Sequence, residues 1–313
     1  MLSRVAHSLY WMARYVERAE NVARFIEVTL HLNLDRQLDE HDQWQPLLQT
    51  SGDLALFAER YGTATRENVI QFLAFDTDYP NSIISSLAAA RENARGVREA
   101  MSRDMWQQLN SLFLAVRDAA SSGGDVVYDF FESVKIGAIG FYGLSSATMS
   151  RGEAWQWMRL GTMIERADKT SRILDVKYFL LLPQTADVGS NYDHVQWAAL
   201  LQSASALQMY RQRHHHTSPE RVAEFLLLDQ EFPRAVSYCI GCADLSLHAI
   251  TGSPPGRFAG EAERQLGRLR AGLGYAAIED IIADGLHEFI DRQQGVLNAI
   301  DSLLFDEFFA HSG

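Results

Sequence analysis

The sequence has few cysteines, prolines and lysines, and each shortage narrows the possible classes of protein. Its 313 residues include two cysteines, Cys239 and Cys242, and seven prolines. Two cysteines cannot build a disulfide framework, which is typical of a reducing compartment. Few prolines and no low-complexity run argue against long disordered linkers. Lysine occurs only at positions 135, 169 and 177, so arginine dominates the basic residues. A GC-rich genome gives this bias, but so do arginines that hold carboxylates or phosphates in bidentate pairs.

The sequence also has no apolar run long enough to cross a bilayer and no start typical of a signal peptide. The formal net charge is −12. A protein that grips nucleic acid concentrates positive charge, so we expect neither nucleic acid nor a membrane as a partner. These features predict a soluble, cytoplasmic protein.

Apolar residues recur at helical spacing along almost the whole chain. A stripe with alternating steps of four and three residues predicts a first helix that packs on other helices: Val5, Leu9, Met12, Val16, Ala19, Ala23, Ile26 and Leu30. Further helices are predicted near 42–61, 65–75, 81–102, 104–121, 125–147, 193–213, 218–228, 233–250, 258–273 and 277–306. Thr65 and Ser218 are predicted N-caps. No stretch alternates with period two, so we predict an all-α fold.

Two parts of the chain resemble each other. The segment 41–49 matches 194–202, with Trp44 meeting Trp197 at an offset of 153. The stretch 16–20, Val-Glu-Arg-Ala-Glu, matches Ile-Glu-Arg-Ala-Asp at 164–168, at an offset of 148. We therefore predict a helical bundle built from two tandem, internally duplicated units, 1–148 and 149–313, related by a pseudo-two-fold within one compact domain.

A charged row runs beside the apolar stripe in both units, in the order small, acid, acid, base, acid. Its members recur at three and four residues and share one helix edge: Ala13, Glu17, Glu20, Arg24 and Glu27, then Gly161, Glu165, Asp168, Arg172 and Asp175. Arg18 and Arg166 lie on the opposite flank of the stripe. One interpretation is a buried charge network that fixes helix packing. The other is a polar pocket in which arginines hold an anion and Glu17 or Glu165 acts as general base.

Two further motifs supply candidate residues. The segment 91–98 is rich in arginine in the first unit alone, and that asymmetry favours a function. Asn81 and Arg234 follow prolines at predicted helix starts, where a helix N-terminus can face an anion. The candidates for binding a substrate or an anion are Arg18, Glu20, Arg24, Asn81, Arg91, Glu92, Arg95, Arg98, Arg166, Asp168, Arg172 and Arg234.

Motifs for metals and cofactors are weak. Cys239 and Cys242 have metal-site spacing but stand alone, and tight helix packing explains them better. The histidines 214–216 are typical of a polar loop. The Glu-x-x-His pairs of di-iron bundles, a phosphate-binding Gly-rich loop and a nucleophile elbow are missing. We expect neither a metal nor a cofactor.

The whole chain resembles the alpha-E family, bacterial helical proteins of unknown function with a Glu-Arg motif. The segments that carry the resemblance are 1–21, 80–83, 91–95, 150–151, 165–168 and 231–234. The resemblance implies genomic association with a circularly permuted ATP-grasp protein, and also with a transglutaminase-like protein and sometimes a proteasome-like peptidase. ATP-grasp enzymes join an activated carboxylate to an amine.

Three functions follow as alternatives. The first is an accessory or scaffold protein of an ATP-grasp amide-ligase system that makes or modifies peptide-like compounds. The second is an enzyme in its own right, with Glu17 or Glu165 as general base on a small acyl or amide substrate. The third is a purely structural interaction protein whose Glu-Arg pairs only hold the fold.

Overall fold

The computed structural model describes residues 1–33, 40–122, 128–181, 191–254 and 256–310. The regular structure in these ranges is helical throughout, and they contain no strand. The all-α prediction is therefore confirmed. The chain separates into two compact units, Met1–Thr162 and Met163–Ala310. This division falls inside one long helix, whereas the predicted repeat boundary after residue 148 lies before it.

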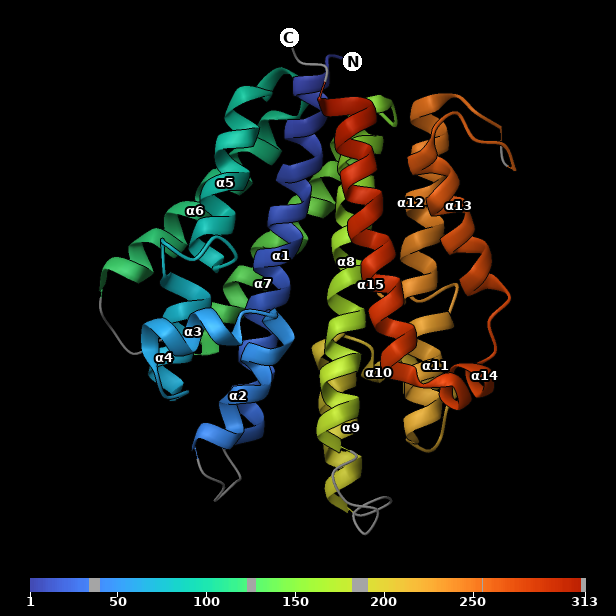
Figure 1. Cartoon of the computed structure of the whole chain (residues 1–313). Helices are drawn as coiled ribbons and strands as arrows, with labels where there is room; N and C mark the ends of the chain where they lie inside the picture. Colours follow the sequence, from blue (N-terminus) through green and yellow to red (C-terminus); the bar gives the residue numbers. More distant parts are fainter. Residues whose placement is uncertain (34–39, 123–127, 182–190, 255, 311–313) are drawn as a thin grey trace. The chain divides into compact units, whose positions relative to one another are not determined.

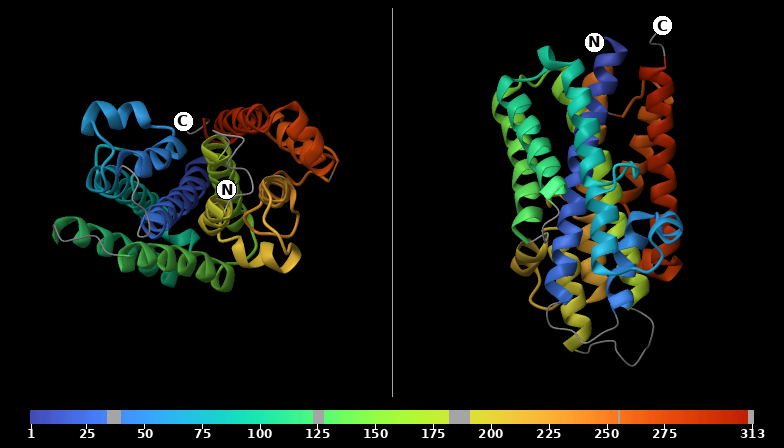
Figure 2. Two further views of the ribbon diagram at one scale, coloured as in Figure 1. Left: turned by 90° about the horizontal axis from the view of Figure 1, so that it is seen from below. Right: turned by 90° about the vertical axis from the view of Figure 1, so that its left-hand side faces the viewer.

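The first unit is organised around helix α1, Ser3–Asn33. It packs against α5 (Ile83–Gly96) and α7 (Tyr128–Thr148), while α6 (Arg103–Ser122) packs against both of these (Figures 1 and 2). The predicted stripe of α1 is buried from Leu9 to Leu30, and Val5 is half-buried. Burial of this stripe supplies the main apolar contribution that orders the helix.

Five short elements complete the described part of the first unit. They are α2 (Glu40–Ser51), α3 (Leu54–Tyr61), α4 (Arg66–Ile70), the π-helix η1 (Gln71–Phe75) and the 3-10 helix η2 (Arg98–Ala100). The single helix predicted over 42–61 is interrupted because Gly52 adopts φ +82°, a left-handed conformation that ends helices. The helix predicted over 81–102 ends early, at Gly96.

The second unit contains most of α8, Glu153–Leu181, followed by a series of shorter helices. These are α9 (Asn191–Ser203), α10 (Leu207–Arg213), α11 (Pro219–Leu228), α12 (Val236–Thr251), α13 (Glu261–Gly274), α14 (Ile278–Asp284), α15 (Leu286–Leu304) and the π-helix η3 (Phe305–Phe309). Helix α13 packs against both α12 and α15. The helix predicted over 277–306 is split because Gly285 adopts φ +100°.

Helix starts follow the local side chains. The Thr65 hydroxyl accepts a hydrogen bond from the Asn68 backbone N–H at 3.3 Å, and that of Ser218 accepts one from the Arg221 N–H at 3.4 Å. Both predicted N-caps are therefore confirmed. The starts predicted at Pro80 and Pro233 are wrong.

At these two prolines a turn comes first. The backbone N–H of Ser82 bonds to the Tyr79 carbonyl at 3.1 Å, and helix α5 begins only at Ile83. In the second unit the Ala235 N–H bonds to the Phe232 carbonyl at 2.9 Å before α12 begins. In the first unit the Ser82 hydroxyl accepts the Ser85 N–H at 3.1 Å and caps α5, which places the helix start after the turn.

The same arginine–aspartate pair occurs in both units, with its arginine in α3 of the first unit and in α10 of the second. In the first unit Arg60 pairs with Asp76 at 3.1 Å, and the Asp76 carboxylate accepts the Asp78 N–H at 2.9 Å. In the second unit Arg213 pairs with Asp229, whose carboxylate accepts the Glu231 N–H at 2.9 Å. All three positions differ by the offset of 153 read from the sequence.

Candidate functional site

The charged row of α1 is buried in the first unit. Glu17 and Glu20 have no exposed surface, and Arg24 is 7% exposed. Arg24 pairs with Glu20 one turn earlier on the helix. The Asn21 side-chain amide donates to the Glu17 carboxylate at 3.0 Å and to the Glu17 carbonyl at 2.7 Å. Buried charges need such partners, because an unpaired one costs several kcal/mol.

The motif arginine Arg18 does not join this row. Its guanidinium donates to the Asn81 side-chain oxygen at 2.7 Å. The same guanidinium lies 5.4 Å from the Tyr15 ring centre. Two predicted site residues, 63 positions apart, therefore meet. Since Asn81 belongs to the turn before α5, the bond ties α1 to the start of that helix.

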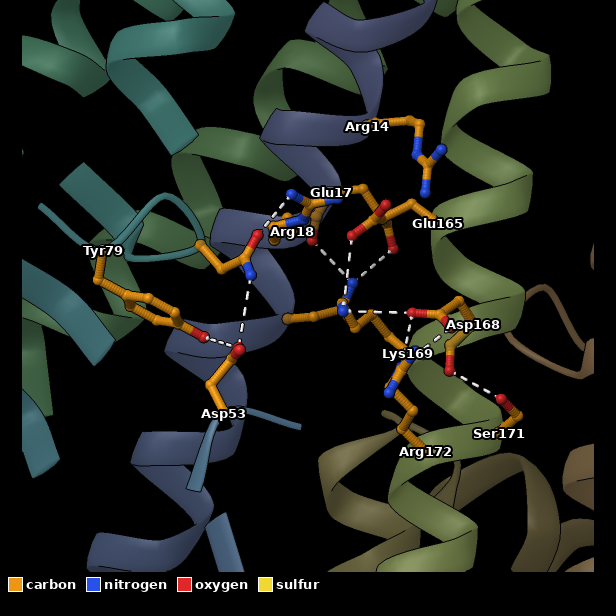
Figure 3. Close-up of polar contacts among 12 residues, drawn as sticks. Arg14, Glu17, Arg18, Asp53, Tyr79, Glu165, Asp168, Lys169, Ser171 and Arg172 are labelled. Atoms are coloured by element: carbon orange, nitrogen blue, oxygen red, sulfur yellow. Dashed lines mark hydrogen bonds and ion pairs between the residues drawn. The ribbon is translucent and has the colours of Figure 1, made fainter. Parts of the chain in front are cut away.

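Asp53 extends this contact. It accepts hydrogen bonds from the Tyr79 hydroxyl and, at 3.5 Å, from the Asn81 amide (Figure 3). Burial and the bond to Asp53 raise the pKa of the Tyr79 hydroxyl, so it stays protonated and donates. The sequence analysis missed Asp53; its position directly after Gly52, ahead of a helix, was the available signal.

The row of the second unit lies on α8. Asp168 is 8% exposed and accepts two hydrogen bonds from Arg172 Nε, at 2.9 and 3.0 Å. Lys169 Nζ lies 3.2 Å from Asp168 and 3.7 Å from Glu165, which has no exposed surface (Figure 3). Burial favours the neutral acid, but Lys169 and Arg172 outweigh it and lower the pKa of Asp168. Asp168 is therefore a carboxylate at neutral pH.

The two rows differ in charge at one position. The residue four after the first motif glutamate is the neutral Asn21 in the first unit and Lys169 in the second. The motif arginine of the second unit, Arg166, donates to the Pro233 carbonyl at 3.4 Å. It therefore reaches the turn before α12, as Arg18 reaches the turn before α5. Arg234 is half-buried in that turn.

The last acid of each row, Glu27 or Asp175, contacts a basic residue or a histidine on another helix. Glu27 of α1 pairs with Lys135 of α7 in the first unit. In the second unit Asp175 of α8 lies 2.7 Å from His287 of α15, and the hydrogen bond to Asp175 raises the pKa of the histidine.

The arginine-rich segment of the first unit covers aromatic side chains of α6. Arg91 Nε donates to Asn110 at 2.7 Å, and its guanidinium lies 5.2 Å from the Phe113 ring centre. Arg98 lies 4.8 Å from the Trp106 ring. The other two predicted residues, Glu92 and Arg95, form an exposed ion pair at 3.5 Å. Arg91 of α5 and Arg98 of η2 thus contact α6 through cation–π interactions.

An opening with a mixed polar and apolar lining lies between α12 and α13 of the second unit. Four arginines line it, together with the buried acids Asp244 and Glu263. Asp244 is not among the candidate residues that the sequence patterns predicted. The available signal was the spacing of Arg264, Arg268 and Arg270 on one predicted helix.

In the described ranges no three His, Cys, Asp or Glu side chains are grouped so that they could hold a metal ion. Cys239 and Cys242 are buried and form no disulfide bond, in keeping with helix packing. Among the described helices, none combines the length and the apolar character that crossing a bilayer requires.

Comparisons with known proteins identify a family that shares the Glu-Arg motif. A family model named Alpha-E, a predicted alpha-helical domain with a conserved ER motif, matches residues 1–309. Uncharacterized proteins of Mycobacterium bovis and Mycobacterium tuberculosis are 25% identical over 307 residues. The match covers 90% of this chain but 34% of each relative, so the chain spans about a third of their length. No solved structure matches this chain.

Proposed function

Since this chain belongs to the Alpha-E family, we propose that it is an accessory subunit of an ATP-grasp amide-ligase system that makes or modifies peptide-like compounds. The observation that supports this proposal is the greater length of the relatives. In the mycobacterial relatives the matching region is only 34% of the polypeptide, so there it is joined to a much larger remainder. A helical domain that is covalently joined to other parts in relatives is suited to work beside a partner here. The identity of the ligase partner rests on the family resemblance.

The charged rows support a framework role for the Glu-Arg motif. A general base must come within hydrogen-bond reach of the proton that it removes. Glu17 and Glu165 have no exposed surface, and each has a described polar partner one turn later on its own helix. The motif arginines hold the turns that precede α5 and α12. The Glu-Arg motif therefore fixes the positions of helices within each unit. We propose that other surfaces of the protein recognise the partner.

We further propose that the two units arose by duplication and are related by a pseudo-two-fold. The matched Arg60–Asp76 and Arg213–Asp229 pairs support this, as do the matched caps Thr65 and Ser218. Trp44 and Trp197 are both almost fully buried. Duplicated scaffolds keep such framework contacts while their outer surfaces diverge, and the arginine-rich segment of one unit is an example.

Reconstitution with the ATP-grasp protein tests the accessory role. The two proteins are co-expressed, purified through a tag on one of them, and the ligase turnover is measured as ADP release with and without this chain. We expect a stable complex and a turnover that depends on this chain. A ligase that is fully active alone and forms no complex would contradict the proposal. The transglutaminase-like protein is the second partner to test in the same purification.

A further inference from the structure

A groove of about 1060 Å³ runs along the contact between α12 and α13 in the second unit. Its lining is rich in arginine and also includes the exposed aromatic residues Phe258 and Tyr275, 59% and 93% exposed. Glycines at three positions of the two helices keep part of the lining free of side chains. A concave surface with convergent polar groups is the usual form of a small-ligand site.

Two of the arginines are engaged within the protein. Arg270 pairs with the Asp244 Oδ2 atom at 2.7 Å. Arg264 pairs with Glu261 at 3.2 Å and lies over the Phe258 ring. Arg257 and Arg268 are exposed, and neither forms an ion pair with another described residue. Two guanidinium groups are therefore available to an anion, and guanidinium binds carboxylates in bidentate geometry.

The floor of the groove carries a buried acceptor. Asp244 is 1% exposed, and its Oδ1 atom has no hydrogen-bond partner among the described residues. The His248 Nε2 atom lies 3.7 Å from Oδ1, beyond hydrogen-bond distance. A Cβ atom at Gly267 would lie 3.8 Å from Oδ1, so the absent side chain leaves that atom next to the groove. A buried carboxylate oxygen without a donor is costly, and a ligand N–H removes that cost.

The other ring nitrogen of His248, Nδ1, already has polar partners. Its Nδ1 atom lies 2.7 Å from both the Ser253 hydroxyl and the Glu263 carboxylate. Glu263 is itself held by Thr251 at 2.9 Å and by the Ala259 N–H. Burial works against the charged form of Glu263, but these hydrogen bonds lower its pKa. The cluster therefore has a fixed geometry, and Oδ1 of Asp244 is its one acceptor left for a ligand among the described residues.

We propose that this groove binds a small acidic peptide or amino-acid-like ligand. Its carboxylate pairs with Arg257 and Arg268, and its nitrogen donates a hydrogen bond to Asp244 Oδ1. The inference stands apart from the ligase association, because the groove lies in this chain alone. Loss of ligand binding would leave complex formation with the ligase intact, and the reverse also holds.

A matched pair of glycine variants tests the role of Oδ1. Gly267→Ala places a methyl group beside Oδ1 at ordinary contact distance, while Gly272→Ala on the same helix meets nothing within 4 Å. Both changes favour the helix, so both variants are expected to fold. Calorimetric titration of the full chain with the dipeptide glutamyl-glutamate should give a Kd about tenfold weaker for Gly267→Ala, which corresponds to one lost charged hydrogen bond. Gly272→Ala should match the wild type.

The ligand chemistry is tested by the choice of probe. Glutarate carries two carboxylates but no N–H donor, and alanyl-alanine amide carries donors but no carboxylate. Both should bind more weakly than the acidic dipeptide. Arg268→Gln should weaken the dipeptide, whereas Arg292→Gln on the exposed face of α15 should not. Equal binding by all three probes, no measurable binding of the dipeptide, or equal losses in Gly267→Ala and Gly272→Ala would each overturn the proposal.

Discussion

Arg18 donates a 2.7 Å hydrogen bond to the side-chain oxygen of Asn81, and this bond joins α1 to the turn that starts α5. Arg166 makes the corresponding contact in the second unit, to the Pro233 carbonyl at 3.4 Å. The motif arginine thus fixes the position of a turn relative to the long helix of its unit. Its partner differs, a side chain in one unit and a backbone carbonyl in the other.

Arg18→Gln should destabilise the protein because it removes a charged hydrogen bond from a half-buried site. We expect a loss of about 1–3 kcal/mol in the free energy of unfolding. A double-mutant cycle with Asn81→Ala, followed by urea denaturation, should show a coupling energy of about 1 kcal/mol. Arg95→Gln, at an exposed pair, should change stability by less than about 0.5 kcal/mol. A coupling energy near zero would contradict the Arg18–Asn81 contact.

The Glu20–Arg24 pair is buried, so removal of one charge should be costly. Glu20→Gln should lower stability by about 3 kcal/mol or more, since it removes one charge of an ion pair that has almost no exposed surface. Glu92→Gln is the control: it loses the pairs with Arg91 and Arg95, but the Glu92 side chain is 60% exposed, so the variant should stay within about 0.5 kcal/mol of the wild type. Similar melting temperatures for the two variants would argue against a buried pair.

Gly161 allows α8 to approach α1 closely at the start of the helix. A Cβ atom there would lie 2.3 Å from the Tyr10 carbonyl oxygen, a backbone atom that cannot turn aside. Gly161→Ala should therefore cost about 1–3 kcal/mol despite the better helix propensity of alanine. Gly152→Ala meets nothing within 4 Å and serves as the control. A Gly161→Ala variant that melts at or above the wild-type temperature would exclude this close approach.

The His287–Asp175 contact should make stability depend on pH. The hydrogen bond to Asp175 raises the pKa of His287 in the folded state above its ordinary value of 6.5. The contribution is therefore complete below about pH 6.5 and disappears as the pH rises through the raised value. His287→Gln should lower the melting temperature at pH 5.5 and change it little at pH 9. The histidine side chain is 42% exposed, so the shift should be small and should shrink with added salt. An equal loss at both pH values would show that packing, not charge, is responsible.

Local sequence patterns predicted much of the fold. The apolar stripe of α1 and the caps at Thr65 and Ser218 depend on neighbours three or four residues away, and both were found where expected. Left-handed glycines were harder to place. Gly52 and Gly285 end helices that the apolar pattern alone continues.

The candidate sites depended on contacts that periodicity does not encode. The sequence patterns predicted Arg18 and Asn81 as separate candidates. Their hydrogen bond joins residues 63 positions apart, so it could be predicted only if the packing partner of α5 were known. The groove of α12 and α13 was missed for the same reason. Asp244 and Arg270 are unremarkable on their own helices and become informative only when they pair across the groove.

The most direct test of the account is the activity of the ligase in the presence of a variant with both motif glutamates neutralised, Glu17→Gln with Glu165→Gln. The variant is compared with the wild type at a temperature at which circular dichroism shows both to be folded. If the motif is a framework, the folded variant melts at a lower temperature but still binds the ATP-grasp protein and supports its turnover. A variant that is as stable as the wild type, forms the complex and yet supports no turnover would contradict the account and assign catalysis to the glutamates.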